Sequence, residues 1–168
     1  MSNGNWLTTA AYHESGHMVA GAAVGWPVGE IWIIRDGTDE TGNAQARCGT
    51  YWHQDNEPLN WVVETYGGLI AQWRYPGRGW PEYAKEDYEH IRIALRAAAN
   101  DVDQQVRLRR RARRRARVLV DRHWGAVEAL GTALLGGESE YAPGCHRLWP
   151  HQVQRVLGTH GLQASVAG

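Results

Sequence analysis

The sequence predicts a mainly α protein of the α+β class with one small β-hairpin. Six segments begin or end at residues typical of helix boundaries, one pair of segments is rich in β-branched and aromatic residues, and no period of roughly 20–50 residues repeats. The chain has 168 residues, 43% of them hydrophobic, which is enough for one domain with a core and short for two. We therefore expect a single domain over residues 1–168.

The first helix is expected over residues 8–24. Gly25 suits the position just beyond a helix end, and Pro27 blocks continuation of the helix. The β-branched and aromatic residues 28–35 predict a strand, and residues 46–53 predict its partner after a polar turn. These two strands form the expected hairpin.

A second helix is expected over residues 58–74, where a proline occupies the first position. Its interior contains Gly67 and Gly68. Paired glycines weaken a helix, so we expect them to let another helix approach closely. A loop rich in glycine and proline separates this helix from a third one, expected over residues 83–99.

The C-terminal half is also predicted to be helical. Asp101 or Asp103 is suited to cap a fourth helix that runs to about residue 124. A fifth helix is expected over residues 126–135, before two glycines, and a proline begins a short last helix over residues 150–157.

The first helix carries His13-Glu14-Ser15-Gly16-His17, which matches the HExxH pattern of zinc peptidases. Residues four apart lie on one helix face, so the two histidines project side by side. Glu14 lies roughly 100° round the helix, where it can reach a metal-bound water as general base. Chance HExxH patterns also occur, with both histidines on the surface or satisfied in the core. The apolar flanks favour a metal, because unpaired histidines and a glutamate are costly in a buried helix.

A zinc peptidase needs a third protein ligand, and Asp87 is the candidate. It lies near the start of the third helix, where the helix dipole favours a carboxylate. A helix cap or a surface charge is the alternative interpretation of this residue.

The order of these features resembles the peptidase domain of the FtsH-type zinc proteases. In that family a HEAGH-type helix is followed by a β-hairpin, a helix with a Gly-Gly pair, and an Ala-x-x-Asp helix that supplies the third zinc ligand. The resemblance covers roughly residues 8–158. The matching segments of this sequence are residues 12–17, 49–51, 67–71 and 84–88.

The resemblance implies a helical zincin-like peptidase domain that contains Zn²⁺. Glu14 is the implied general base, and an extended substrate would pair with the second hairpin strand beside the cleft. The implied metal ligands are His13, His17 and Asp87. The implied substrate-binding residues are Cys48, Gly49 and Thr50.

The sequence also departs from the family pattern. The acidic pair that follows the two glycines in the family is Gln72-Trp73 here, and no GxxxxGK[ST] phosphate loop is present. We therefore expect a metallopeptidase that works without ATP on peptides or on unfolded or precursor polypeptides. Family members form hexameric rings, so a homo-oligomer is among the expectations.

A cytoplasmic location is expected. No apolar run approaches the ~20 residues needed to span a bilayer, and the first residues lack the basic and apolar regions of a signal peptide. The two cysteines are too few for a disulfide framework.

Eight arginines lie between Arg107 and Arg117, a density that would attract phosphates. A structural interpretation is favoured over nucleic-acid binding, because apolar residues recur between the arginines at helical spacing and predict a buried stripe. Docking of an acidic partner ranks between the two. The alternative to a peptidase is thus a non-catalytic zinc-containing binding or regulatory module that uses this helix. The residues of the stripe are Leu108, Ala112, Ala116 and Leu119, with His123 as a further candidate.

Overall fold

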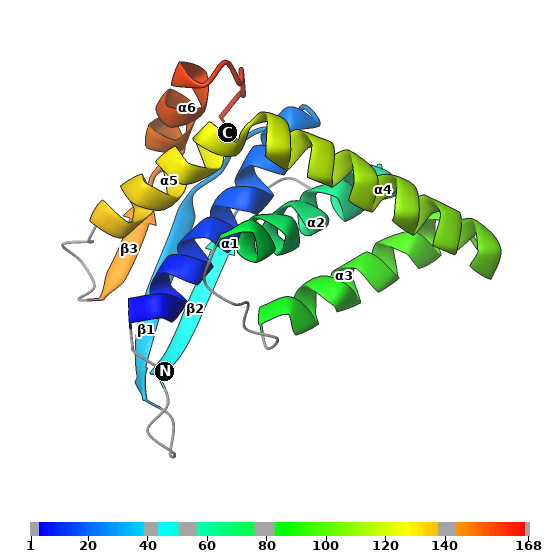
Figure 1. Ribbon diagram of the computed structural model, residues 1–168, viewed down its shortest axis with the longest axis horizontal. Coiled ribbons are helices and arrows are strands. Elements are labelled where there is room, and N and C mark those ends of the chain that lie inside the picture. The colour runs from blue at the N-terminus through cyan, green and yellow to red at the C-terminus, as the bar shows by residue number, and fades with distance from the viewer. Residues whose placement is uncertain (1–3, 39–43, 51–56, 76–82, 138–143, 167–168) are drawn as a thin grey trace.

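The computed structural model describes residues 4–38, 44–50, 57–75, 83–137 and 144–166. Within these ranges the predicted fold class is confirmed, because the chain is mainly helical and contains a β-hairpin (Figure 1). The elements are α1 (Gly4–Ala23), β1 (Ile31–Thr38), β2 (Ala44–Thr50), α2 (Pro58–Arg74), α3 (Tyr83–Ala98), α4 (Val102–Arg122), α5 (Trp124–Gly136), β3 (Cys145–Leu148) and α6 (Pro150–Thr159).

The sheet has three strands in the order β2-β1-β3, and both pairs are antiparallel. The predicted hairpin is β1 with β2, in a register that pairs Ile33 with Cys48. The strand β3 is an addition that the sequence did not predict, because four residues are too short to show an alternating pattern. The first strand also begins later than predicted, since Val28 forms an isolated parallel bridge with Val166 instead. Residues 51–53 of the predicted second strand lie outside the described residues.

Helices α1 and α2 pack with their backbones in close contact, and glycine makes this possible. A Cβ atom added at Gly67 would lie 2.4 Å from the Ala20 Cβ atom and 2.5 Å from the Gly16 backbone oxygen. A Cβ atom at Gly16 would lie 2.5 Å from both the Ala71 Cβ atom and the Gly67 backbone oxygen. The expectation of a close helix approach is therefore confirmed for Gly67. It places the histidine-bearing face of α1 directly against α2.

The buried apolar residues form two clusters. One contains mainly residues of α1, β1, α5 and α6, together with Ala71 of α2 and Val120 of α4, and the other contains residues of α2, α3 and α4. Figure 1 shows β3, α5 and α6 on one side of α1, and α3 and α4 on the side of α2. The close contact of α1 with α2 therefore joins the two clusters.

Helix α4 has the apolar stripe that the sequence predicted. The Asp101 side chain caps it by accepting a hydrogen bond from the Gln104 backbone N–H, so Asp101, not Asp103, is the cap. The arginines between positions 107 and 117 are all exposed. The stripe residues Ala112 and Ala116 are fully buried, while Leu108 and Leu119 are partly buried.

Candidate metal centre

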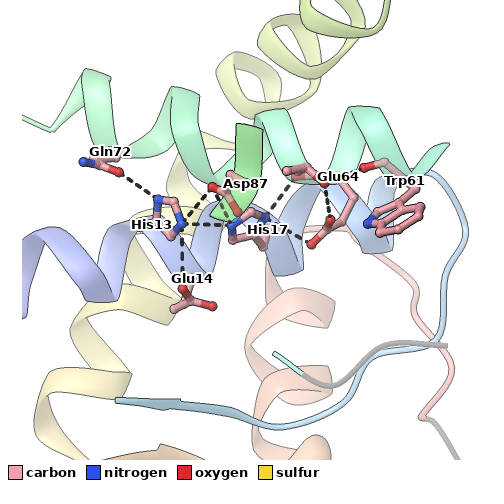
Figure 2. Close-up of polar contacts among 8 residues, drawn as sticks. His13, Glu14, His17, Trp61, Glu64, Gln72 and Asp87 are labelled. Carbon is pink, nitrogen blue, oxygen red and sulfur yellow. Dashed lines mark hydrogen bonds and ion pairs between the residues drawn. The ribbon is translucent and has the colours of Figure 1, made fainter. Parts of the chain in front are cut away.

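The first half of the site comes from α1. His13, Glu14 and His17 are all buried, although their side chains are polar or charged. The one-turn spacing of the histidines brings their Nε2 atoms to 3.0 Å from each other, with the two rings edge-on (Figure 2). The structure thus brings the two histidines of the HExxH pattern together as the helical spacing predicts.

Asp87 comes from α3, a helix that lies far from α1 in sequence. Its side chain is buried, and its Oδ2 atom lies 3.2 Å from His13 Nε2 and 3.5 Å from His17 Nε2 (Figure 2). A capping residue would lie before the first turn of the helix, whereas Asp87 is the fifth residue of α3. A surface charge would face solvent, whereas the Asp87 side chain is buried. Asp87 is therefore neither a helix cap nor a surface charge. The distant carboxylate selected from the sequence therefore lies beside both histidines.

The three atoms His13 Nε2, His17 Nε2 and Asp87 Oδ2 form a triangle with sides of 3.0, 3.2 and 3.5 Å. Zinc holds nitrogen and oxygen ligands at about 2.0–2.2 Å in tetrahedral geometry, which places the donor atoms roughly 3.3 Å apart. The Asp87 Oδ2 atom is buried and, despite its closeness to both rings, makes no hydrogen bond of acceptable geometry. Two imidazoles and a carboxylate are also the donor types of catalytic zinc sites. The residues present therefore fit a zinc ion.

Glu14 lies next to this triangle. Its Oε1 atom is 3.8 Å from His13 Nε2, farther than the Asp87 oxygen, and donor atoms of Glu14 and both histidines all lie within 4.8 Å of one another. The alternative donor set, in which Glu14 and not Asp87 accompanies the histidines, is therefore the less compact one. Figure 2 shows Glu14 on a different side of His13 from Asp87.

Two side chains of α2 hold the outer nitrogens of the histidine rings. His13 Nδ1 lies 2.8 Å from Gln72 Oε1, and its N–H donates to this amide oxygen. His17 Nδ1 lies 3.1 Å from Glu64 Oε1 and 3.2 Å from the Glu64 backbone oxygen. Each ring thus turns its Nε2 atom toward the triangle and its Nδ1 atom toward α2 (Figure 2).

Sequence reasoning missed both Glu64 and Gln72 as site residues. The signal was a spacing: Glu64, Gly68 and Gln72 lie four residues apart, on one face of α2. Gly68 belongs to this face, because a Cβ atom there would come within 2.3 Å of His17 Nε2. The expectation that both glycines serve helix approach is thus refined: Gly67 faces the backbone of α1, and Gly68 makes room for a histidine ring.

The buried charges of the site compensate one another. Burial alone would lower the pKa of His17, but the Asp87 and Glu64 carboxylates raise this pKa well above its ordinary value. Burial alone would raise the pKa of Asp87, but His17 and His13 lower it below the usual range of a carboxyl group. Within the described part of the chain, no Lys or Arg forms an ion pair with these carboxylates. A divalent cation would compensate the same charges.

The segment selected for substrate binding lies in the sheet. Cys48, Gly49 and Thr50 end β2, where their backbones pair with Ile33, Trp32 and Ile31 of β1. Among the described strands β2 has no partner on its other side, and it contacts α1. A strand edge without a partner strand can offer N–H and C=O groups to an extended peptide.

No family model matches this chain, and no curated protein matches it either. Membership of the FtsH-type peptidases therefore stays a prediction.

Proposed function

We propose that the protein is a zinc-dependent metallopeptidase that hydrolyses peptide bonds without ATP. The observation that carries this proposal is the convergence of His13 Nε2, His17 Nε2 and Asp87 Oδ2 within 3.5 Å of one another, with Glu14 beside them. A two-histidine, one-carboxylate donor set also suits iron, but the glutamate that follows the first histidine is the general base of HExxH peptidases.

In this proposal His13, His17 and Asp87 hold the metal. When bound, zinc supplies Lewis acidity, which acidifies water and polarises a peptide carbonyl. Glu14 takes a proton from the attacking water and can return it to the leaving amine. Its burial keeps bulk water away from the carboxylate.

The substrate is proposed to be an extended polypeptide segment. The edge of β2 that pairs with no other described strand would pair with it in an antiparallel or parallel ladder, which fixes the backbone and leaves specificity to neighbouring side chains. Strand addition requires a segment that is not already folded. Peptides, unfolded chains and flexible parts of precursor proteins meet this requirement, and the sequence contains no phosphate loop for ATP-driven unfolding.

The experiment combines metal analysis with mass spectrometry of a peptide library, with and without a zinc chelator. The wild-type protein should contain about one zinc per chain and should cleave peptides only when the zinc is present. Glu14→Gln should retain the zinc and lose at least about a hundredfold in turnover, since general-base catalysis contributes 10²–10⁴-fold. Glu128→Gln, an exposed glutamate on α5, is the matched control and should keep full turnover.

Two results would contradict the proposal. Turnover retained in the Glu14→Gln variant would exclude Glu14 as general base. Zinc bound by the wild-type protein without cleavage of any peptide would favour the alternative, a non-catalytic zinc-containing module. For that module the arginine-rich α4, whose arginines are exposed, is the surface to test for an acidic partner or nucleic acid.

A further inference from the structure

We propose that Glu64 is a positioning residue of the metal centre, which fixes the ring of His17 and selects its tautomer. This inference rests on the proposed function, because it requires His17 to be a metal ligand. Glu64 is only 2% exposed and lies in the interior of α2. A carboxylate at such a position is costly unless a partner compensates it.

The partner is His17, and the contact determines which ring nitrogen carries the proton. His17 Nδ1 lies 3.1 Å from Glu64 Oε1 and 3.2 Å from the Glu64 backbone oxygen. An ionised carboxylate and a carbonyl only accept hydrogen bonds, so Nδ1 must be the donor. In the neutral imidazole the lone pair is then on Nε2, the atom that faces His13 and Asp87 (Figure 2).

The neighbouring hydroxyl does not take the place of His17. Thr65 Oγ1 lies 3.3 Å from Glu64 Oε2 and 2.9 Å from the Trp61 backbone oxygen. A hydroxyl has one hydrogen and can donate to only one of these oxygens at a time. The shorter contact is the one to the Trp61 backbone oxygen. The buried Glu64 carboxylate therefore depends on His17 for its hydrogen bond.

Gly68 confines the ring from one turn farther along α2. A Cβ atom at this position would lie 2.3 Å from His17 Nε2 and 2.5 Å from His17 Cδ2, so the ring packs directly on the glycine backbone. Glu64 and Gly68, four residues apart, therefore fix the ring together. Glu64 holds the Nδ1 atom of the ring, and Gly68, which has no side chain, leaves just enough space for the ring.

The two histidines are held unequally. His13 donates to the amide of Gln72, a neutral group that can present either its oxygen or its nitrogen to the ring. Glu64 presents a negative charge and only acceptors, which makes His17 a more basic ligand. Loss of the Glu64 carboxylate should therefore weaken metal binding more than loss of the Gln72 side chain does.

The test is the zinc affinity of the purified chain, measured by competition with a chromophoric chelator. Glu64→Ala should bind zinc about 10–100-fold more weakly than the wild-type protein, the range for loss of a partner of a ligating histidine. Glu64→Gln, which keeps the shape of the side chain, should show a smaller loss and an altered visible spectrum of the cobalt-substituted protein. Glu57→Gln, an exposed glutamate that precedes α2, should bind zinc with wild-type affinity.

Thermal melting separates positioning from a structural role. A structural role would lower the Tm of the metal-free and zinc-loaded protein equally, whereas positioning predicts that the zinc-induced rise in Tm is smaller in Glu64→Gln. Wild-type zinc affinity in both Glu64 variants, or in Glu64→Gln alone if Glu64→Ala does not fold, would overturn the inference. Failure of the wild-type chain to bind zinc would overturn the proposed function itself. This outcome differs from failure of the inference about Glu64, because the wild-type protein alone reveals it.

Discussion

At the scale of single residues, the site is a closed set of polar groups that compensate one another inside an apolar protein. His13, His17, Glu64 and Asp87 are all buried, and their side chains make polar contacts with one another, with Gln72 and Thr65, and with Glu14 beside them. Removal of any one member leaves another without its partner, which costs about 1–3 kcal/mol for a buried polar group. Single substitutions here therefore test function and stability together.

Asp87→Ala should lower zinc affinity by at least about a hundredfold, because one of three donor atoms is lost. Equilibrium dialysis followed by metal analysis would measure it. Asp103→Ala, an exposed aspartate in the first turn of α4, is the control and should keep full zinc affinity. Full zinc occupancy in Asp87→Ala would mean that another group, first of all Glu14, completes the ligand set.

The stabilisation by zinc should increase as the pH rises from about 6 to about 8. The raised pKa of His17 stabilises the metal-free fold below the unfolded histidine pKa of about 6.5, and this contribution is lost as the pH rises through the higher folded value. Zinc requires neutral His17, so its binding strengthens over the same rise. The lowered pKa of Asp87 acts only at far more acidic pH. Melting curves with zinc and with chelator would measure the difference in Tm, and a difference that narrows with rising pH would contradict this expectation.

At the scale of elements, the two glycines of α2 have separate functions, and alanine substitutions should separate them. Gly67→Ala forces α1 away from α2, so it should lower the free energy of unfolding by about 1–3 kcal/mol or more, as overpacking does. Gly68→Ala meets the His17 ring, so its main effect should be weaker zinc binding. Urea unfolding and zinc competition would measure the two effects.

The control is Gly158→Ala in α6, where an added Cβ atom meets nothing within 4 Å. It should raise the stability by about 0.4–1 kcal/mol, because alanine restricts the unfolded chain and suits a helix. Equal effects of Gly67→Ala and Gly68→Ala on both measurements would show that the two positions do not differ in function.

At the scale of the whole molecule, the candidate centre lies where the two apolar clusters meet. The histidines belong to α1, which packs in the cluster with the sheet, α5 and α6, whereas Asp87 belongs to α3 in the other cluster. A metal held by both would tie α3 to α1, although α3 packs chiefly on α2. No helix in the described ranges is both long and apolar enough to cross a membrane.

Removal of the metal should therefore loosen α3 selectively. Hydrogen exchange measured by mass spectrometry should become faster in α3 after chelation, while α5 and α6 keep their protection, because α3 supplies a metal ligand and packs chiefly on α2, whereas α5 and α6 supply no ligand. Asp87→Asn should show the faster exchange of α3 even with zinc present. Uniform acceleration in all helices would indicate that the metal supports global stability instead.

The sequence determined the fold class, most helix boundaries and the one-turn pair His13 and His17, because these depend on local rules of periodicity and capping. It also selected Asp87, by its position near the start of a helix that follows a loop rich in glycine and proline, and by the order of features in a family resemblance that stays a prediction. Only the tertiary structure placed Asp87 Oδ2 at 3.2 Å and 3.5 Å from the two rings. The strand β3 depends on pairing with β1 across more than a hundred residues, which no local pattern of four residues reveals.

The same reason explains why Glu64 and Gln72 were missed. In sequence they are ordinary polar residues of a helix, and their meaning comes from the helix packed against them, which presents His17 and His13 in the reverse order. The separate functions of Gly67 and Gly68 likewise depend on which atoms of α1 face them. Local chemistry thus fixed which residues could bind a metal, and the contact between α1 and α2 decided how those residues are held, because orientation is set by neighbours distant in sequence.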